Sequence, residues 1–493
     1  MIAAHLPALQ VVLPLIAAPV CVLLRRPLAA WLLALIATWA SAAVAIALLL
    51  QVLEGGTISY MLGSWAAPWG IEYRVDIVNA FLLVLVSGIG SVVVLYARAS
   101  VGYEIPVERQ YLFWTAYLLC LAGLLGIAIT GDGFNVFVFL EISSLGTYIL
   151  IALGRDRRAL VASYQYLIMG TIGATFIVIG VGLLYLLTGT LNLADLSSRI
   201  GSVSHPRPQL AALAFLTVGI SLKLALFPLH LWLPNAYAYA PSAAAAFLSA
   251  TATKVAVYLL LRFYFSVFGQ SQVFAHLPLP EVLLVLSLAA MFVASTVAVF
   301  QRDVKRMFAY SSVAQIGYIT LGASFVSLTG LTGGIVHLFN HAVAKGAIFL
   351  LLGCVALRMG QPTIERMAGL GKRMPWTTAG LTIGGLSLIG VPGTVGFVSK
   401  WYLVLAALER GWWWLAIAVL ISSLIAVVYV WRLVEVCYFR DPSGHEDRVS
   451  EAPLSMLVPA LLLAAACIFF GLYTSATVGT AAQAARSLLE NLR

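Results

Sequence analysis

The chain has 493 residues, of which 62% are hydrophobic and only 10% are charged, and its formal net charge is +9. A soluble globular domain carries about 25% charged residues, so this composition excludes an ordinary soluble protein. The positive charge is not gathered into a long basic stretch, which excludes a nucleic-acid-binding protein and is typical of loops that face the cytoplasm.

Apolar runs recur from one end of the chain to the other, and each is long enough to cross about 30 Å of hydrocarbon. In lipid the backbone polar groups must be satisfied within the segment, so these runs are predicted to be helices. The first run ends in Arg25 and Arg26 without a small-residue cleavage site, so we expect a retained span and not a signal peptide. The fold class predicted is an all-α polytopic membrane protein.

We predict fourteen transmembrane helices. In chain order they cover residues 7–24, 28–53, 75–97, 111–129, 133–153, 160–188, 209–238, 242–266, 280–301, 306–328, 331–357, 376–407, 412–438 and 453–476.

The arginines and lysines of the connecting segments predict the orientation. With the N-terminus outside, 17 of these cations fall on the inner side and 7 on the outer side. Inner loops carry the excess of positive charge, so this distribution predicts that both termini lie outside. The inner group includes Arg302, Lys305 and Arg448, and the outer group includes Arg262 and Arg493.

Two of the predicted spans are long and interrupted. The seventh contains Pro228 and Pro234, and the twelfth contains Pro392 with Gly393 and Gly396. Proline removes a backbone donor and breaks a helix, which is tolerated at membrane depth where the segment is buried in protein or lines a wet cavity. Each broken span is the fourth in a block of five, and such inverted repeats are typical of transporters. We therefore divide the chain into residues 1–110 (helices 1–3), 111–266 (first repeat, helices 4–8), 280–438 (second repeat, helices 9–13) and 453–476 (helix 14).

Lysines are the residues that stand out. The connecting segments and span ends use arginine almost throughout, whereas the four cations left in the interior of the predicted spans are all lysines: Lys223, Lys254, Lys345 and Lys400. Arginine keeps its proton under any condition in a protein, while a buried lysine changes its pKa readily. Lys254 lies about 18 Å into its span, too deep to reach the interface by snorkelling. This pattern predicts groups that take up and release protons inside the membrane.

One carboxylate, Glu141, lies at depth in "FNVFVFLEISSLGTYIL". An unpaired buried carboxylate would take up a proton, so a cationic partner is expected, and Lys223 is the best candidate. Tightening of such a pair would load Lys223 with a proton, and separation would release that proton. The alternative is a static ion pair that only fixes the packing.

The eleventh predicted span contains a stripe of titratable side chains. His337, His341 and Lys345 are spaced i, i+4 and i+8, which places all three on one face of a helix. Histidine titrates near neutral pH and passes protons through either ring nitrogen. These three residues are therefore predicted to form part of a proton relay.

His230 follows Pro228 at the break of the seventh span, where it would either join the relay or cap the broken helix. Asp76 and Glu435 lie at the ends of spans, where solvation at the interface is the expected state. The five cysteines stand singly within apolar runs, so no metal site and no bound cofactor is predicted.

Five motifs resemble those of one family, the antiporter-like subunits shared by Mrp-type cation/proton antiporters, respiratory complex I and membrane-bound hydrogenases. They are "FNVFVFLE", "SLKLALFPLHLWLPNAYAYAPSAAAAFLSATATK", "QRDVKRMFAYSSVAQIGY", "HLFNHAVAKGAIFL" and "GVPGTVGFVSKWYL". The resemblance implies that Glu141 and Lys223 are the charge pair, Lys254 the bridging lysine, His337 and His341 the central histidines and Lys400 the terminal lysine. It also implies a route from the cytoplasm to Lys223, across through Lys254 and the histidines, and out past Lys400.

Among the members of this family, a D-type Mrp subunit, an N-like subunit and a hydrogenase relative fit the chain, and the residues around Glu141 and the stretch "LLYLLTGTLNLADL" most resemble the Mrp D type. Lys400 stands where the M subunit of complex I has a glutamate, and the chain ends about 17 residues after the last span, too soon for the lateral helix of the L subunit. The function expected is the proton-translocating subunit of a multi-subunit Na+/H+ antiporter in the inner membrane of a prokaryote, working with other membrane subunits. The alternative is a proton-pumping subunit of an NADH-quinone oxidoreductase or a membrane-bound hydrogenase. A membrane scaffold without transport is disfavoured by the buried titratable groups, and no sodium site can be located.

Overall fold

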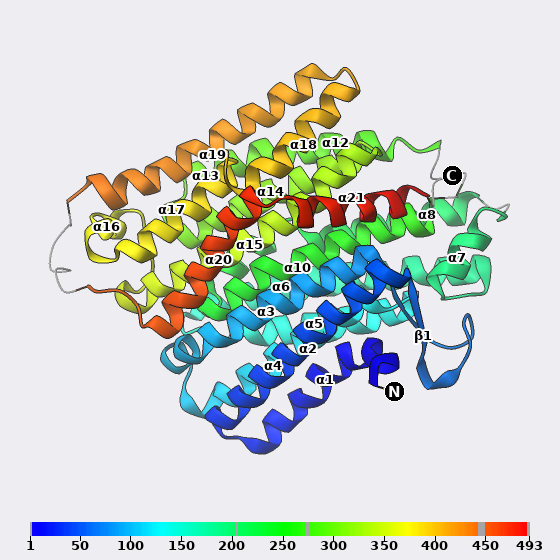
Figure 1. The fold of residues 1–493 in the computed structure, drawn as a ribbon, viewed down its shortest axis with the longest axis horizontal. Coiled ribbons are helices and arrows are strands. Elements are labelled where there is room, and N and C mark those ends of the chain that lie inside the picture. The colour runs from blue at the N-terminus through cyan, green and yellow to red at the C-terminus, as the bar shows by residue number, and fades with distance from the viewer. Residues whose placement is uncertain (1, 204–205, 270, 272–275, 442–448, 491–493) are drawn as a thin grey trace.

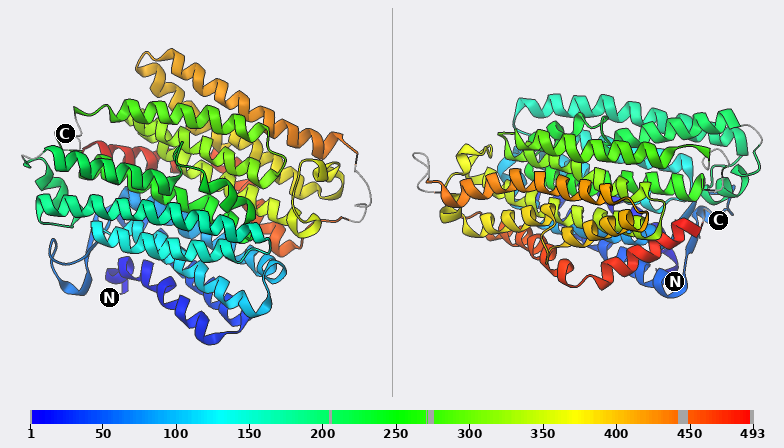
Figure 2. Two further views of the ribbon diagram at one scale, coloured as in Figure 1. Left: turned by 180° about the vertical axis from the view of Figure 1, so that it is seen from behind. Right: turned by 90° about the horizontal axis from the view of Figure 1, so that it is seen from above.

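A computed structural model describes residues 2–203, 206–269, 271, 276–441 and 449–490. Within these residues the chain forms a bundle of long helices that run in broadly similar directions (Figure 1). The first two helices lie at one edge of the bundle, and the helices near residues 395–439 lie at the opposite edge (Figure 2).

The first half of the chain supplies ten helices and one hairpin within the described residues. They are α1 Leu6–Leu24, α2 Pro27–Gly55, β1 Ile58–Met61, β2 Glu72–Val75, α3 Ile77–Glu104, α4 Gln110–Ile129, α5 Gly133–Ala152, α6 Arg157–Thr188, α7 Leu193–Ile200, α8 Pro206–Leu224, α9 Trp232–Tyr239 and α10 Ser242–Leu261, which continues as a π-helical turn, Arg262–Val267.

The second half of the chain is largely helical where it is described, and one short 3-10 turn, Glu365–Met367, precedes α16. Its helices are α12 Leu279–Ala289, α13 Ser295–Val299 (joined to α12 by a π-helical turn, Ala290–Ala294), α14 Val304–Ser324, α15 Leu328–Met359, α16 Leu370–Arg373, α17 Pro375–Ile389, α18 Val395–Glu409, α19 Trp413–Phe439, α20 Leu454–Leu472 and α21 Ser475–Glu490.

Eleven helices in the described parts of the chain are long and apolar enough to cross a membrane. They coincide with eleven of the predicted spans, so the protein is the multi-pass helical membrane protein that the sequence predicts. The other three predicted spans, 209–238, 306–328 and 376–407, coincide with the interrupted pairs α8–α9 and α17–α18 and with the more polar α14. The total of fourteen and the inverted repeats stay predictions.

Apart from the four-residue α16 and short turns, three elements were not predicted, and each has a weak signal in hydropathy. The hairpin pairs β1 with β2 in antiparallel register, Ile58 opposite Val75, between two spans. The eight-residue α7 is amphipathic, and so is α21, which buries an alanine-rich face that includes Ala481, Ala484 and Ala485. A helix with one apolar face does not form a continuous apolar run, so a search for spans overlooks it.

The two interruptions fall at the proline-rich segments. α8 ends at Leu224 and α9 begins at Trp232, so Pro228 and His230 lie between them. α17 ends at Ile389 and α18 begins at Val395, with Pro392 between them. A broken helix leaves carbonyl and amide groups without intrahelical partners, so each break offers polar backbone atoms inside the bundle.

The start of α1 and the end of α21 lie at the same end of the bundle, together with the β hairpin and α7 (Figure 1). We call this the termini end, and the other the far end. Termini on one side agree with an even number of spans, while the side of the membrane stays a prediction. Arg448 and Arg493, which were counted for the orientation, lie outside the described residues.

α15 forms the axis of the bundle. Its residues from Gly330 to Val355 are almost all buried, and it packs against α3, α10, α14, α17, α18, α20 and α21. The helix that carries His337, His341 and Lys345 is therefore surrounded by protein and not by lipid.

Candidate functional site

The four lysines within the predicted spans come from four different helices, α8, α10, α15 and α18, and all of them are buried. Lys254 and Lys345 are 0% exposed, and Lys223 and Lys400 are 6% exposed. An ammonium group without partners is very costly to bury, so the contacts of each one decide how it is held.

Lys223 lies in the last turn of α8, and its Nζ donates a hydrogen bond to Ser144 Oγ on α5 at 2.7 Å. Near this contact α6 approaches α8 closely, because Gly173 of α6 and Gly219 of α8 face one another. A Cβ added at Gly219 would lie 2.6 Å from the Gly173 carbonyl oxygen. Small residues of this kind allow two membrane helices to approach closely.

Glu141 does not make the ion pair that the sequence predicts. It is half-buried on α5, its Oε1 is buried without a hydrogen-bond partner, and no ion pair within 4.0 Å joins it to Lys223 among the described residues. Lys223 remains within electrostatic range of it. The reason is local: Ser144 lies one helical turn after Glu141, about 4.5 Å along α5, and takes the ammonium group instead.

A small cavity of about 30 Å³ separates Lys223 from α10. It is lined by Lys223, Ser144 and Tyr166 on one side and by Val255 and Ala256 of α10 on the other. A water molecule needs about 10–15 Å³ of such space, so the cavity has room for water between Lys223 and the helix of Lys254.

Lys254 is held by its own helix. Its Nζ donates to the carbonyl oxygen of Ser249 and, at 3.4 Å, to Thr253 Oγ1. It lies within electrostatic range of His341 and Lys345 on α15, against which α10 packs.

The two histidines of α15 stack along the helix, with ring centroids 6.4 Å apart and an angle of 13° between the ring planes. His337 joins two other helices: Nδ1 lies 2.8 Å from Ser399 Oγ on α18, and Nε2 lies 2.8 Å from Gln315 Oε1 on α14. His341 is 2% exposed, and neither of its ring nitrogens has a partner among the described residues. Histidine can pass a proton through either ring nitrogen, so the predicted relay role of His341 stays a prediction.

Lys345 is the last residue of the stripe that His337 and His341 begin, and it lies nearest to the far end of the bundle. Its Nζ donates to the Phe308 carbonyl oxygen at 2.6 Å and to Ser311 Oγ, both on α14. The Phe308 ring also lies 5.4 Å from the ammonium nitrogen, so α14 holds this cation through backbone, hydroxyl and ring.

Lys400 uses the break between α17 and α18. Its Nζ donates to the carbonyl oxygens of Leu388 and Ile389 and to Ser423 Oγ, each at 2.9 Å. The end of a helix offers free carbonyl groups and a partial negative charge, which stabilise a cation. The face of the Tyr318 ring, 4.5 Å away, adds to this.

Lys400 and His337 are connected by hydrogen bonds. Gln315 Nε2 donates to the Leu388 carbonyl oxygen at 3.5 Å, and this oxygen also accepts from Lys400. The other end of the same amide contacts His337 Nε2. A line of hydrogen-bonded polar groups therefore runs from Lys400 to His337 of α15.

His230 stands apart from this line. It lies in the break after α8, 7% exposed, stacked on Phe227 at 5.3 Å between ring centroids, and its ring also faces Tyr310 of α14. No hydrogen bond joins it to a lysine in the described part of the chain. The structure thus places it at the break and leaves its role open to the two interpretations that the sequence allows.

Two expectations about span ends were wrong. Asp76 is buried and pairs with Arg262, with 2.7 Å between Oδ2 and Nη1, where solvation was expected. Lys305, counted as a loop cation, is only 7% exposed, and its Nζ donates to Ser242 Oγ at 3.2 Å. Both errors have one cause: position along the chain does not reveal which face of a helix end is covered by its neighbours.

The polar partners of Lys223, Lys400 and His337 were missed by the sequence analysis because they carry no charge. Their only signal is a small polar or amide side chain inside an apolar helix. They are Ser144, Gln315, Ser399 and Ser423.

Gly396 gives a prediction that tests the geometry around Lys400. A Cβ at this position would lie 1.7 Å from the Ser387 carbonyl oxygen, so α18 and the end of α17 would be forced apart. We expect Gly396→Ala to lower the free energy of unfolding by about 1–3 kcal/mol. The purified complex should therefore melt at a lower temperature, and transport should be impaired.

The matched control for this prediction is Gly182→Ala on α6, where a Cβ meets nothing within 4 Å. This change should be neutral or slightly stabilising, since alanine favours a helix over glycine. Equal melting temperatures for Gly396→Ala and the unmodified protein would contradict the close approach.

Comparisons with known proteins agree on one family. The family model described as NADH:quinone oxidoreductase/Mrp antiporter, TM, matches residues 130–426. NADH-quinone oxidoreductase subunit N of Desulforudis audaxviator is 40% identical to this chain over 97% of its length and 98% of the relative. The D-type Na(+)/H(+) antiporter subunit of Alkalihalophilus pseudofirmus is 31% identical over 87% of this chain and 85% of the relative.

A solved structure is also similar. In the Mrp complex from Dietzia sp. DQ12-45-1b, one chain superimposes on this one with a TM-score of 0.91 and 26% identity, covering 99% of this chain and 98% of that chain. The similarity extends over nearly the full length of both chains, so it includes the helices that carry all four buried lysines.

Proposed function

Because the chain belongs to the NADH:quinone oxidoreductase/Mrp antiporter transmembrane family, we propose that it is the proton-translocating subunit of a multi-subunit Na+/H+ antiporter. Protons move along the buried file of Glu141, Lys223, Lys254, the two histidines and Lys345 to Lys400. The other membrane subunits of the assembly are its partners, as the Mrp complex of Dietzia suggests.

The observation that carries this proposal is a hydrogen-bonded polar line from Lys400 to His337, with further buried titratable side chains beyond it. Lys400 reaches His337 through the Leu388 carbonyl oxygen and Gln315, and His337 stacks on His341, which lies in range of Lys254 and Lys345. A cavity with room for water separates Lys254's helix from Lys223. Side chains that only fixed the packing would not need to be titratable at each of these positions.

The proposed orientation of the chain in the membrane follows from the arginines and lysines of the loops. We place both termini on the outer side of a prokaryotic plasma membrane, because the far end carries the excess of arginine and lysine. Protons then enter or leave the inner side near Lys223 and the outer side near Lys400, and the second ion, Na+, passes elsewhere in the assembly.

A redox-driven proton pump is the second candidate, and the 40% identity with NADH-quinone oxidoreductase subunit N favours it. The same lysines and histidines would serve in it, with the driving force supplied by partner subunits. The two candidates differ in what proton movement is coupled to, sodium movement in the antiporter and electron transfer in the pump. An experiment that supplies only one of these separates them.

The test is Na+/H+ exchange in inverted membrane vesicles that contain the whole complex. An ammonium gradient sets up a proton gradient, and a pH-sensitive dye follows its collapse when NaCl is added, with no redox substrate present. We expect the sodium pulse to dissipate the gradient, and vesicles without the complex to show no response. A proton gradient that forms only with an electron donor, and that sodium leaves unchanged, would contradict antiport and support the pump.

A further inference from the structure

Tyr148 is a buried side chain beside Lys223 that the file described above does not include. Only 6% of its surface is exposed, and its hydroxyl oxygen has no hydrogen-bond partner among the described residues. Buried tyrosine hydroxyl groups usually find a partner, so this one is free to make a contact in another state of the protein.

Glu141, Ser144 and Tyr148 form one stripe along α5, because they are spaced i, i+3 and i+7. Lys223 contacts the middle residue, with 2.7 Å between its Nζ and Ser144 Oγ. A helical side chain leans toward the N-terminus of its helix, so the Tyr148 ring extends back toward the turn of Ser144. A carboxylate and a phenol therefore lie on either side of the residue that holds Lys223.

Gly170 of α6 shows how close the tyrosine and the lysine are. A Cβ added at Gly170 would lie 2.1 Å from the Tyr148 hydroxyl oxygen and 3.4 Å from Lys223 Nζ. The two atoms are therefore at most 5.5 Å apart, the sum of these two distances. A small rotation of the flexible lysine side chain brings them within hydrogen-bond distance, and only glycine at position 170 leaves room for the hydroxyl.

The Tyr148 ring is held in place by two aromatic neighbours. It meets Tyr166 of α6 edge to face, with 5.0 Å between ring centroids, and Tyr166 stacks on Trp232 at 3.8 Å. Trp232 Nε1 donates to the carbonyl oxygen of Leu222, the residue before Lys223, at 2.9 Å. The hydroxyl is thus fixed relative to the turn of α8 that carries the lysine.

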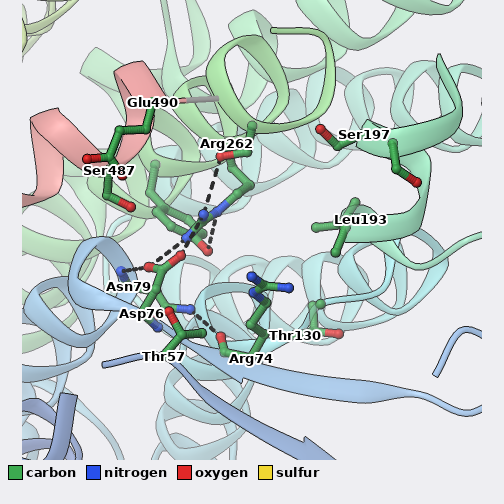
Figure 3. Close-up of a pocket in the computed structure, with 15 residues that line it drawn as sticks. Thr57, Arg74, Asp76, Asn79, Thr130, Leu193, Ser197, Arg262, Ser487 and Glu490 are labelled. Atoms are coloured by element: carbon green, nitrogen blue, oxygen red, sulfur yellow. Dashed lines mark hydrogen bonds and ion pairs between the residues drawn. The ribbon is translucent and has the colours of Figure 1, made fainter. Parts of the chain in front are cut away.

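Few other titratable groups face Lys223 in the described part of the chain. Glu141 is the charged group within electrostatic range of it, and Tyr166 lines the small cavity beside it. The buried pair of Asp76 and Arg262 faces a separate cavity at the termini end, which Lys223 does not line (Figure 3). The side chains that α4 and α10 present to the small cavity are apolar: Leu124, Ile127, Ala252, Val255, Ala256 and Leu259.

The two protonation states of Lys223 need different partners. The ammonium form has three donors and no acceptor, so a carboxylate or a serine oxygen suits it. The neutral amine has a lone pair, which is satisfied only by a donor. An ionised Glu141 has no proton to donate, whereas a phenolic hydroxyl donates well.

We infer that Tyr148 is a positioning residue of the proton file: once Lys223 has passed its proton on, the Tyr148 hydroxyl donates a hydrogen bond to the neutral Nζ. This inference rests on the proposed function and adds a third partner to the Lys223 site. Tyr148 keeps its own proton throughout, and Nζ accepts a hydrogen bond only. The contact stabilises the neutral amine away from Glu141, and it therefore favours release of the proton from Lys223.

Tyr148→Phe tests this contact, because it deletes the hydroxyl and keeps the ring. Without the donor the neutral amine is less stable, so Lys223 releases its proton at higher pH. In vesicles that contain the whole complex, the pH of half-maximal Na+/H+ exchange should rise by about 0.5–1 unit, the effect of one hydrogen bond. For the same reason the exchange rate at pH 7 should fall about threefold to tenfold.

Tyr117→Phe is the matched control. The Tyr117 hydroxyl is also fully buried, and it donates to the Gly90 carbonyl oxygen at 2.7 Å, away from the file. This variant should leave the pH of half-maximal exchange unchanged. A general loss of packing lowers the amount of assembled complex, which is measured in parallel, and does not move the pH profile.

Gly170→Ala tests the same contact from the other helix. Its Cβ would displace the Tyr148 hydroxyl, so the same rise in pH and fall in rate are expected. Gly182→Ala on the same helix, where a Cβ meets nothing within 4 Å, should behave like the unmodified complex. Since both changes remove one contact, Tyr148→Phe and Gly170→Ala together should shift the profile no further than either alone.

The outcomes separate this inference from the proposed function. If Tyr148→Phe leaves the profile unmoved, or if the two shifts add in the double variant, the role of Tyr148 is overturned. The proposed function then stands as long as Lys223→Ala abolishes exchange in the same vesicles. If Lys223→Ala exchanges at the full rate, the proposed function falls and this inference falls with it. Equal upward shifts in both single variants and the double variant, with both controls unmoved, support the contact.

Discussion

Vesicles that contain Lys254→Arg in the whole complex should show no Na+/H+ exchange above background, although the charge at this position is conserved. Lys254 is fully buried in the middle of α10, and its ammonium group is held by the Ser249 carbonyl oxygen and Thr253. A guanidinium group does not release its proton in a protein, so it would satisfy these acceptors permanently and block the file. We expect a loss of transport of at least about 100-fold, which is the scale of a lost proton-transfer group.

The control for this prediction is Lys372→Arg, the same change at an exposed lysine near Asp441. Lys254→Met keeps about the length of the side chain and removes both its charge and its titrating group, whereas Lys254→Arg keeps the charge. If both Lys254 variants fail and the complex assembles, a titrating group is required. If Lys254→Arg transports at the normal rate, a fixed positive charge suffices, and the proton path does not pass through this residue.

The fold could be predicted from the sequence to the extent that a helix is apolar along its whole length. The eleven helices that pass that criterion in the described chain all coincide with predicted spans. α21 and α7 were missed because only one of their faces is apolar, and the hairpin of β1 and β2 is too short to form a pattern. Mean hydropathy finds segments that are apolar on all sides. These elements bury one face against protein and keep the other face polar, so their mean hydropathy is low.

The candidate site was predictable through the choice of residue type. Lysine inside apolar spans and arginine outside them marked Lys223, Lys254, Lys345 and Lys400, and the structure buries all four. Their roles stay predictions, since burial shows where a group lies and not what passes through it.

Contacts were less predictable than positions. The sequence suggested Glu141 as the partner of Lys223, and the structure places Ser144 there instead. Neutral partners such as Gln315 carry no signal of their own, because a single amide in an apolar helix is equally compatible with a structural contact. The burial of Lys305 and Arg262 depends on the helices beside them, which no local pattern reveals.

The contact between Lys223 and Ser144 sharpens the proposed switch. Glu141 and Ser144 are one turn apart on α5, and Lys223 lies within electrostatic range of the carboxylate that it does not touch. A flexible lysine side chain can therefore alternate between a charged partner, which favours the ammonium form, and a neutral one, which does not. In the structure Lys223 contacts the neutral partner, Ser144.

Lys223→Ala and Glu141→Ala are each expected to abolish exchange while the complex still assembles, because either change leaves the switch with one partner. Ser144→Ala should lower transport by about tenfold or less, since it removes only a neutral acceptor and leaves the carboxylate to hold the lysine. Exchange in vesicles, with the amount of assembled complex measured in parallel, checks all three.

Glu435→Ala is the matched control for the carboxylate, because Glu435 lies near the end of α19 and contacts the exposed Arg440 at 3.1 Å. It should transport at the unmodified rate. Full transport in Lys223→Ala would contradict the switch outright. If Glu141→Ala transports fully and Ser144→Ala does not, the hydroxyl and not the carboxylate controls the proton on Lys223, and the alternation between two partners must be abandoned for a fixed contact.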